Sequence, residues 1–211
     1  MTQPWIKICG ITQNKDADYA AQLGVNALGF VFYSKSPRSI SSKVLPKIIE
    51  NLKGSVSIVA LFVDPTRDEV SEVLDSGLID LIQFHGNESE EFCSSFDTPY
   101  MKALHIKDQC LPLSVFDKYS SARYLLLDTF SRKVSGGTGK TFDWSIARDA
   151  MEKTNREIII AGGLNPTNVE YVVKAINPFG VDVSTGVESA LGIKDITKLD
   201  RFVREARSVR S

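Results

Sequence analysis

The feature that most constrains the fold is an eightfold alternation of short apolar segments with longer amphipathic segments. The short segments are nearly continuous apolar runs, which is typical of parallel strands covered on both faces. They predict strands at Ile6–Cys9, Ala27–Phe32, Ser57–Val63, Leu78–Gln83, Tyr100–Leu104, Tyr124–Asp128, Glu157–Ala161 and Gly180–Val183. The amphipathic segments predict helices at Lys15–Leu23, Ser42–Leu52, Arg67–Ser76, Ser89–Ser95, Leu113–Tyr119, Asp143–Lys153, Pro166–Ala175 and Ile196–Ser208.

Eight strand–helix units in about 200 residues predict a single (β/α)8 barrel, the TIM-barrel fold, over residues 1–211. An open doubly wound sheet is the alternative, but the chain has no Rossmann glycine fingerprint. Two helix starts carry recognisable signals. Thr66 can cap the third helix, and Pro166 suits the first turn of the seventh.

The amino-acid composition is that of an ordinary globular protein and indicates no particular class of macromolecular partner. The 211 residues are 43% hydrophobic and 24% charged, and the net charge is -1, so we expect no nucleic-acid or membrane partner. No apolar run is long enough to span a bilayer, and no secretory signal is visible at the N-terminus. Three widely spaced cysteines, Cys9, Cys93 and Cys110, indicate neither a disulfide framework nor a zinc site. A reducing cytoplasm fits best, or an organelle lumen reached by a signal not visible here.

In such barrels, functional residues lie at the carboxyl ends of the strands. Cys9 ends the first strand and shares a face with Lys7, which predicts a thiol at the barrel mouth with an ammonium one layer below. A lone cysteine is more often a packing residue. A nearby ammonium would lower the thiol pKa, which is the condition for a reactive cysteine.

Polar residues also follow the second and fourth strands. Arg38 follows Pro37 and can clamp a carboxylate or phosphate, although a single arginine is more often a solubilising surface residue. Gln83 and His85 share one strand face, where the histidine could be a base, a ligand or a hydrogen-bonded mouth residue. No second histidine or carboxylate stands at metal-ligand spacing, and His105 cannot be paired with a ligand set. We therefore predict no metal site.

The sixth strand ends in Asp128, a carboxylate that is costly beside an apolar strand unless it is paired or used. The loop that follows resembles a phosphate loop at Ser135–Lys140, but Val134 stands where the Walker pattern requires glycine. We interpret this loop as a lid, with glycines at Gly136, Gly137 and Gly139.

Glycines and hydroxyl residues gather after the last two strands. Gly162 and Gly163 end the seventh strand, and Ser184, Thr185 and Gly186 follow the eighth. Barrels commonly bind phosphate at these two loops, because backbone N–H groups can approach an anion closely there. The two loops together predict a small phosphorylated ligand.

These segments together resemble the phosphoribosylanthranilate isomerase family, from Ile6 to Asp195. The matching stretches are Lys7–Thr12, Gly29–Phe32 with Ser36–Arg38, Gln83–Gly86, Gly136–Gly139 with Phe142–Trp144, Ala161–Leu164 and Asp182–Glu188. Any one of them is common, but their order and their positions at strand ends are highly specific. The chain departs from the family pattern at Phe84, Thr185 and Leu191.

The resemblance implies roles for individual residues. Cys9 matches the general base, Asp128 the general acid, and Arg38 the residue that binds the anthranilate carboxylate. Gly162, Gly163, Ser184 and Thr185 fall in the phosphate-binding loops. From chain order, we expect Arg38 to lie across the mouth from those loops.

The implied reaction is the isomerisation of N-(5'-phosphoribosyl)anthranilate in tryptophan biosynthesis, without a metal or an organic cofactor. Aspartic acid and cysteine have ordinary pKa values of about 3.9 and 8.5, so the site is expected to raise the first and lower the second. Another phosphosugar barrel enzyme, such as indole-glycerol-phosphate synthase or ribulose-phosphate epimerase, and a non-catalytic phosphosugar-binding barrel are the alternatives. The sequence leaves a monomer and a homodimer equally open.

Overall fold

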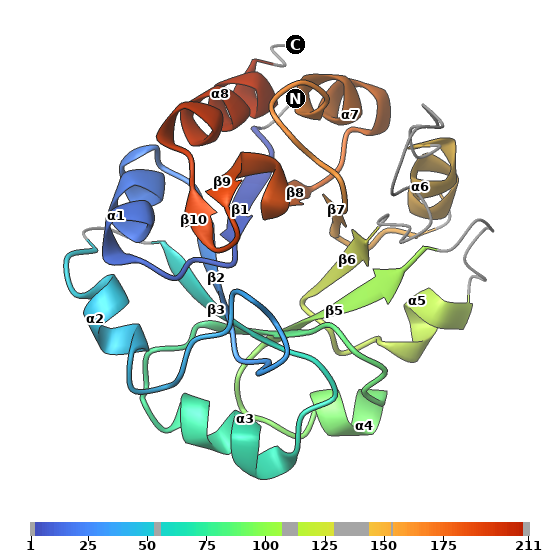
Figure 1. Cartoon of the computed structure of the whole chain (residues 1–211). Coiled ribbons are helices and arrows are strands. Elements are labelled where there is room, and N and C mark those ends of the chain that lie inside the picture. Colours follow the sequence, from blue (N-terminus) through green and yellow to red (C-terminus); the bar gives the residue numbers. More distant parts are fainter. Residues whose placement is uncertain (1–2, 53–55, 107–113, 129–143, 153, 209–211) are drawn as a thin grey trace.

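The chain closes into a barrel of eight parallel strands that pair in chain order (Figure 1). The computed structural model describes residues 3–52, 56–106, 114–128, 144–152 and 154–208. The strands are β1 (Trp5–Cys9), β2 (Ala27–Val31), β3 (Ser57–Phe62), β4 (Leu81–Phe84), β5 (Tyr100–His105), β6 (Tyr124–Asp128), β7 (Ile158–Ala161) and β8 (Gly180–Val183). Pairing of β8 with β1, with Lys7 opposite Asp182, closes the ring.

A helix follows each strand and covers the outside of the barrel (Figure 1). The helices are α1 (Asn14–Gln22), α2 (Leu45–Ile49), α3 (Arg67–Leu74), α4 (Glu90–Cys93), α5 (Ser114–Lys118), α6 (Trp144–Met151), α7 (Val169–Ile176) and α8 (Ile196–Arg207). The predicted (β/α)8 barrel is confirmed. Within the described residues, no helix combines the length and apolar character needed to cross a membrane.

Local signals explain where several elements begin. Thr66 caps α3 as predicted, and its hydroxyl and Glu69 form a reciprocal capping box. The prediction that Pro166 opens α7 is wrong, because the helix begins at Val169. The helix starts later because residues 165–168 form a turn, in which the Asn165 side chain accepts a hydrogen bond from the Thr167 backbone N–H.

Most other boundaries agree within about two residues, and three others differ by three residues. Strand β4 begins at Leu81 rather than Leu78, and helix α2 is shorter at both ends than the predicted Ser42–Leu52. Asp80 explains the first difference, because its carboxylate accepts the Ile58 backbone N–H and holds residues 78–80 as a connection. A short antiparallel hairpin, β9 (Glu188–Ala190) with β10 (Ile193–Lys194), lies between β8 and α8 and was not predicted.

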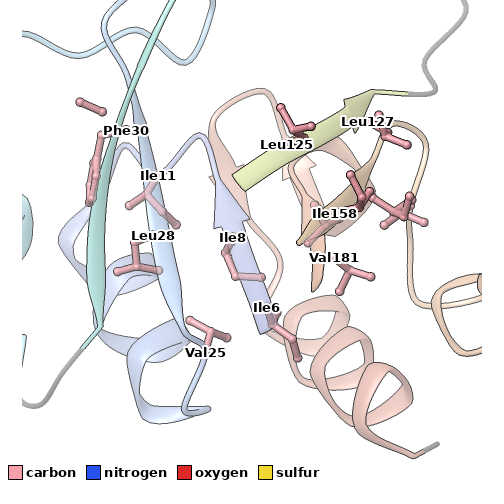
Figure 2. Packing of buried hydrophobic residues seen from close by; sticks show 14 of the residues in the cluster. Ile6, Ile8, Ile11, Val25, Leu28, Phe30, Leu125, Leu127, Ile158 and Val181 are labelled. Carbon is pink, nitrogen blue, oxygen red and sulfur yellow. The ribbon is translucent and has the colours of Figure 1, made fainter. Parts of the chain in front are cut away.

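Strand alternation divides the core into two layers. Outward-facing residues such as Ile8 of β1 and Leu28 of β2, which are register neighbours, pack between the strands and the helices (Figure 2). Inward-facing residues fill the barrel. At its amino-terminal end the rings of Trp5, Tyr124 and Phe179 stack with centroids 5.1–6.4 Å apart and form an apolar floor. Polar side chains inside the barrel therefore concentrate toward the opposite end.

Candidate active site

Cys9 and Lys7 both face the barrel interior from β1. Gly29 of β2 is the register neighbour of Cys9, and a Cβ atom added to it would lie 2.9 Å from the Cys9 Sγ and 3.0 Å from the Lys7 Nζ. The missing side chain of Gly29 thus leaves the space in which thiol and ammonium meet. Cys9 is only 5% exposed and packs with Val31 and Leu61 at the mouth. The predicted arrangement of these two side chains is confirmed.

A buried ion pair lies beneath the thiol. The Lys7 Nζ is 3.0 Å from the Asp182 Oδ1, and neither residue is appreciably exposed. Burial alone would lower the pKa of Lys7, but Asp182 and Cys9 outweigh it, so the pKa is raised and the ammonium persists.

The same surroundings act in opposite directions on Cys9. Burial raises the pKa of its thiol, Lys7 lowers it, and Asp182 raises it again. Burial prevails, so the pKa lies above its ordinary value. The expectation that the site lowers this pKa is therefore wrong for the ligand-free chain, because the ammonium is shared with Asp182 and cannot compensate fully for the loss of water.

Asp128 faces the interior from the end of β6, two residues beyond the inward-facing Leu126. Its Oδ2 lies 3.1 Å from the His85 Nε2, and the His85 Nδ1 lies 2.9 Å from the amide nitrogen of the buried Gln83. The structure thus joins Gln83, His85 and Asp128 in one hydrogen-bonded chain. His105 lies beside this chain of residues, because it is the β5 register neighbour of Asp128.

Arg38 lies beside Cys9 in a second polar network. Glu188 accepts two hydrogen bonds from the guanidinium, from Nε at 2.7 Å and from Nη2 at 2.6 Å, and Thr185 accepts another from Nη2 at 3.2 Å. Glu188 also accepts from the buried Lys194 Nζ at 3.0 Å, which in turn donates to the Cys9 carbonyl at 2.6 Å. Burial favours the neutral form of Glu188, but Arg38 and Lys194 outweigh it and lower its pKa.

This network corrects the expected position of Arg38. The residue does not lie across the mouth from the loop after β8 but touches it through Thr185. Ring closure explains the error, since β8 and β2 are both neighbours of β1 although they are far apart along the chain. Distance from the phosphate loops therefore does not argue that Arg38 binds a carboxylate.

The loops after β7 and β8 lie side by side. Gly162 and Gly163 have φ values of +86° and +69°, which favour glycine. The Gly163 carbonyl accepts hydrogen bonds from the side-chain amide of Asn168 at 3.0 Å, which fixes this turn. A Cβ on Gly186 would collide with the Leu164 carbonyl, whereas a Cβ on Gly163 would meet nothing within 4 Å. The loops are thus packed against each other and leave open space beside Gly163.

Two features lie elsewhere. The predicted lid glycines, Gly136, Gly137 and Gly139, fall outside the described residues. A surface hollow of about 890 Å³ lies at the amino-terminal end of the barrel and is lined by residues 94, 96–100, 120–123 and 155–157. Barrel enzymes bind substrates at the other end, so its size gives no reason to place the chemistry there.

The sequence analysis gave no individual role to three residues that the structure brings to the mouth, Asp182, Glu188 and Lys194, and it did not predict the contact of His105 with Asp128. Asp182 carried a usable signal, since it alternates with Ser184 on one face of an otherwise apolar strand. Lys194 carried none, because its position depends on the unpredicted β9–β10 hairpin.

Comparison with known proteins identifies the family. Residues 6–205 match the family model for N-(5'-phosphoribosyl)anthranilate (PRA) isomerase. The chain belongs to the N-(5'-phosphoribosyl)anthranilate isomerase family. The isomerase of Pseudomonas fluorescens (strain SBW25) is 45% identical over 202 residues, which cover 96% of this chain and 95% of that protein. The isomerase of Legionella pneumophila (strain Paris) is 41% identical and covers 94% of this chain and 95% of its own length.

Solved structures of phosphoribosylanthranilate isomerases share the fold. The Thermotoga maritima enzyme superposes with a TM-score of 0.85 at 34% identity and covers 98% of this chain and 100% of its own. A second isomerase structure, in complex with reduced 1-(o-carboxyphenylamino)-1-deoxyribulose 5-phosphate, has a TM-score of 0.82 at 31% identity, with 98% and 100% coverage.

The departures from the phosphoribosylanthranilate isomerase pattern have structural explanations at two positions. Phe84 faces outward, away from Gln83 and His85, and packs among aromatic rings that include Phe92 and Tyr100, with centroids 5.8 and 5.9 Å away. Thr185 uses its hydroxyl to accept from Arg38. Leu191 is 65% exposed, and nothing in the structure explains it.

Replacing Lys7 tests its effect on the thiol. Lys7→Met removes the charge that opposes burial and leaves Asp182 beside Cys9, so the Cys9 pKa should rise and its alkylation by iodoacetamide should slow by at least about tenfold, the effect of one pKa unit. The rate is measured against pH, with Cys9 labelling followed by peptide mass spectrometry. Lys7→Met/Asp182→Asn separates loss of the cation from the unpaired carboxylate.

Lys102 provides the matched control. It is an equally buried lysine whose Nζ lies 2.8 Å from Glu88, but it is on the outer face of β5. Lys102→Met should leave Cys9 labelling unchanged. Unchanged labelling in folded Lys7→Met would show that Lys7 does not stabilise the thiolate.

Proposed function

We propose that this chain converts N-(5'-phosphoribosyl)anthranilate into 1-(2-carboxyphenylamino)-1-deoxyribulose 5-phosphate, a step of tryptophan biosynthesis, with Cys9 as general base and Asp128 as general acid. The observation that carries the proposal is the placement of an inward-facing thiol and an inward-facing carboxylate at the same end of the barrel. Family membership gives the reaction, and this placement offers the two groups that it needs.

The reaction needs one proton given and one removed. Asp128 donates a proton to the furanose ring oxygen, the bond from that oxygen to C1 breaks, and the nitrogen lone pair forms an iminium. The Cys9 thiolate removes the proton from C2, and the electron pair of that C–H bond forms the enolamine. The enolamine then tautomerises to the ketone. These steps are proton transfers and the opening of the ring, all within one molecule, and the proposal includes no metal or organic cofactor.

The surroundings of Cys9 suit a base that is created during the reaction. Burial disfavours the thiolate in the ligand-free chain, while Lys7 stays charged beside it. The iminium adds a positive charge next to the carbon that loses the proton. Since an adjacent cation stabilises a thiolate, the substrate itself favours ionisation of Cys9.

The two ends of the substrate have separate sites in the proposal. Gly162, Gly163 and the segment Ser184–Gly186 bind the phosphate, and the open space at the Cβ position of Gly163 supports this. Arg38 binds the anthranilate carboxylate, a role that rests on the family resemblance. Its guanidinium is already oriented by Glu188, so little side-chain freedom is lost on binding.

We further propose that Gln83 and His85 contact the substrate from the side of the barrel that carries Asp128.

The Cys9 and Cys93 side chains are free thiols, which supports a cytoplasmic location.

Substitution of the acid–base pair tests the proposal. Cys9→Ser and Asp128→Asn should each reduce kcat by about 100- to 10,000-fold, the usual contribution of a positioned acid or base, while product-analogue binding changes little. Turnover is followed with the purified variants, and folding by thermal unfolding. Near-normal turnover of Cys9→Ala would make Cys9 a packing residue and leave His85 as the next candidate base.

A glycine pair tests the phosphate site. Gly163→Ala should raise KM and the Kd for inorganic phosphate by about tenfold or more, corresponding to about 1.4 kcal/mol, with a smaller change in kcat. Gly77 is the control, because it also has a positive φ, +66°, and open space around its Cβ position. It precedes β4 at the amino-terminal end, so Gly77→Ala should cost similar stability without changing phosphate affinity. Equal Kd values for both variants would contradict the assignment.

Arg38→Lys tests the carboxylate site. Lysine cannot reproduce a bidentate clamp, so analogues that carry the aromatic carboxylate should bind about 10- to 100-fold more weakly, the value of a charged hydrogen bond. Analogues that lack it should bind both proteins alike in calorimetry. Equal losses for both kinds of analogue would assign Arg38 to the phosphate instead.

A further inference from the structure

Three potential metal ligands converge at the ends of neighbouring strands. His85 follows β4, His105 ends β5 and Asp128 ends β6. The Asp128 Oδ2 lies 3.1 Å from the His85 Nε2 and 3.7 Å from the His105 Nδ1, and one ligand atom from each residue lies within 4.8 Å of the others. At 3.7 Å the second contact is too long for a hydrogen bond, so hydrogen bonding to Asp128 does not account for His105.

In each imidazole, the ring nitrogen that does not face Asp128 has a hydrogen-bond partner of its own. The His105 Nε2 lies 3.0 Å from the His85 carbonyl oxygen, which can only accept, so Nε2 carries a proton and, in the neutral ring, the Nδ1 lone pair points toward Asp128. Metal-binding histidines are oriented in this way in proteins.

Gln83 can do the same for His85. Its side chain is fully buried, and its Oε1 has no partner among the described residues. The amide group lies against the His85 Nδ1 at 2.9 Å, and its nitrogen and oxygen exchange places by a half-turn. After that turn Oε1 accepts the Nδ1 proton, and the His85 Nε2 lone pair faces Asp128.

We propose that His85, His105 and Asp128 form a binding site for a divalent transition-metal ion of the Zn²⁺ class, and that the bound ion inhibits the isomerase. Two imidazoles and one carboxylate are a ligand set that suits Zn²⁺, with water in the fourth position. Tetrahedral ligands about 2.0–2.1 Å from Zn²⁺ lie about 3.4 Å apart. The two distances to Asp128 bracket that value, so the histidine rings need to move little relative to the carboxylate.

The ion can reach the site from solvent. The side chains of His85, His105 and Asp128 are 23%, 45% and 16% exposed. The inhibitory effect rests on the proposed function, because Zn²⁺ on the Asp128 carboxylate would occupy the oxygen that holds the transferred proton. Binding of the ion does not depend on that role.

His105 gives the decisive variant. It has no role in the proposed reaction, so His105→Gln should keep its turnover while its Kd for Zn²⁺ and the Zn²⁺ concentration for half-inhibition rise at least about tenfold. Calorimetry with Zn²⁺ should give one equivalent bound to the untagged protein. The chain has only two histidines, so an affinity tag would obscure the result.

A variant of Cys9 tests whether its thiolate, rather than the two imidazoles and the carboxylate, binds the ion. Cys9→Ser should bind Zn²⁺ as tightly as the unmodified chain, and Co²⁺ in place of Zn²⁺ should show no thiolate charge-transfer absorption. Loss of binding in Cys9→Ser, or unchanged affinity in His105→Gln, would overturn the site. Zn²⁺ binding that requires His105 but leaves turnover intact would uphold the site, overturn the inhibition and count against Asp128 as the acid.

Discussion

The buried ion pair between Lys7 and Asp182 is the interaction on which the mouth of the barrel depends. It spans the two strands that close the ring, so it forms only when the barrel is complete. Removing either partner would leave an uncompensated charge, at a cost of about 3–5 kcal/mol. The pair also sets the field beneath Cys9. This contact therefore links closure of the fold to the electrostatics of the proposed base.

A second buried charge organises the entrance. Glu188 joins Arg38, from the loop after β2, to Lys194 of the β9–β10 hairpin, and Lys194 binds the carbonyl of Cys9. Three segments distant in sequence thus meet around the end of β1. Because each charged group has a partner of opposite charge, ion pairing offsets the free-energy cost of removing the Arg38 guanidinium from water. The two networks meet at Cys9, one at its side chain and one at its backbone.

Patterns along the chain predicted more of the fold than of the site. Continuous apolar runs predicted the eight strands because burial on both faces leaves that signature. Strand-end positions made Cys9 and Asp128 candidates, but only the family resemblance implied their roles as base and acid. The same runs could not show that Leu78 and Ile79 precede β4, since a half-buried connection is equally apolar. The position of Arg38 and the contact of His105 with Asp128 depend on which strands are neighbours in the closed ring, and spacing along the chain does not contain that information.

The raised pKa of Cys9 is compatible with a role as base. A thiolate of high pKa is scarce at neutral pH, but each one accepts a proton more readily than a thiolate of low pKa. In the proposed reaction Cys9 removes a proton from carbon, which calls for a strong base even if little of the thiol is ionised at rest. The proposed iminium would add a positive charge at the adjacent carbon, next to the fixed charge of Lys7, and both would favour the thiolate. Burial that makes the resting thiol inert would thus protect Cys9 from alkylation and oxidation until substrate is bound.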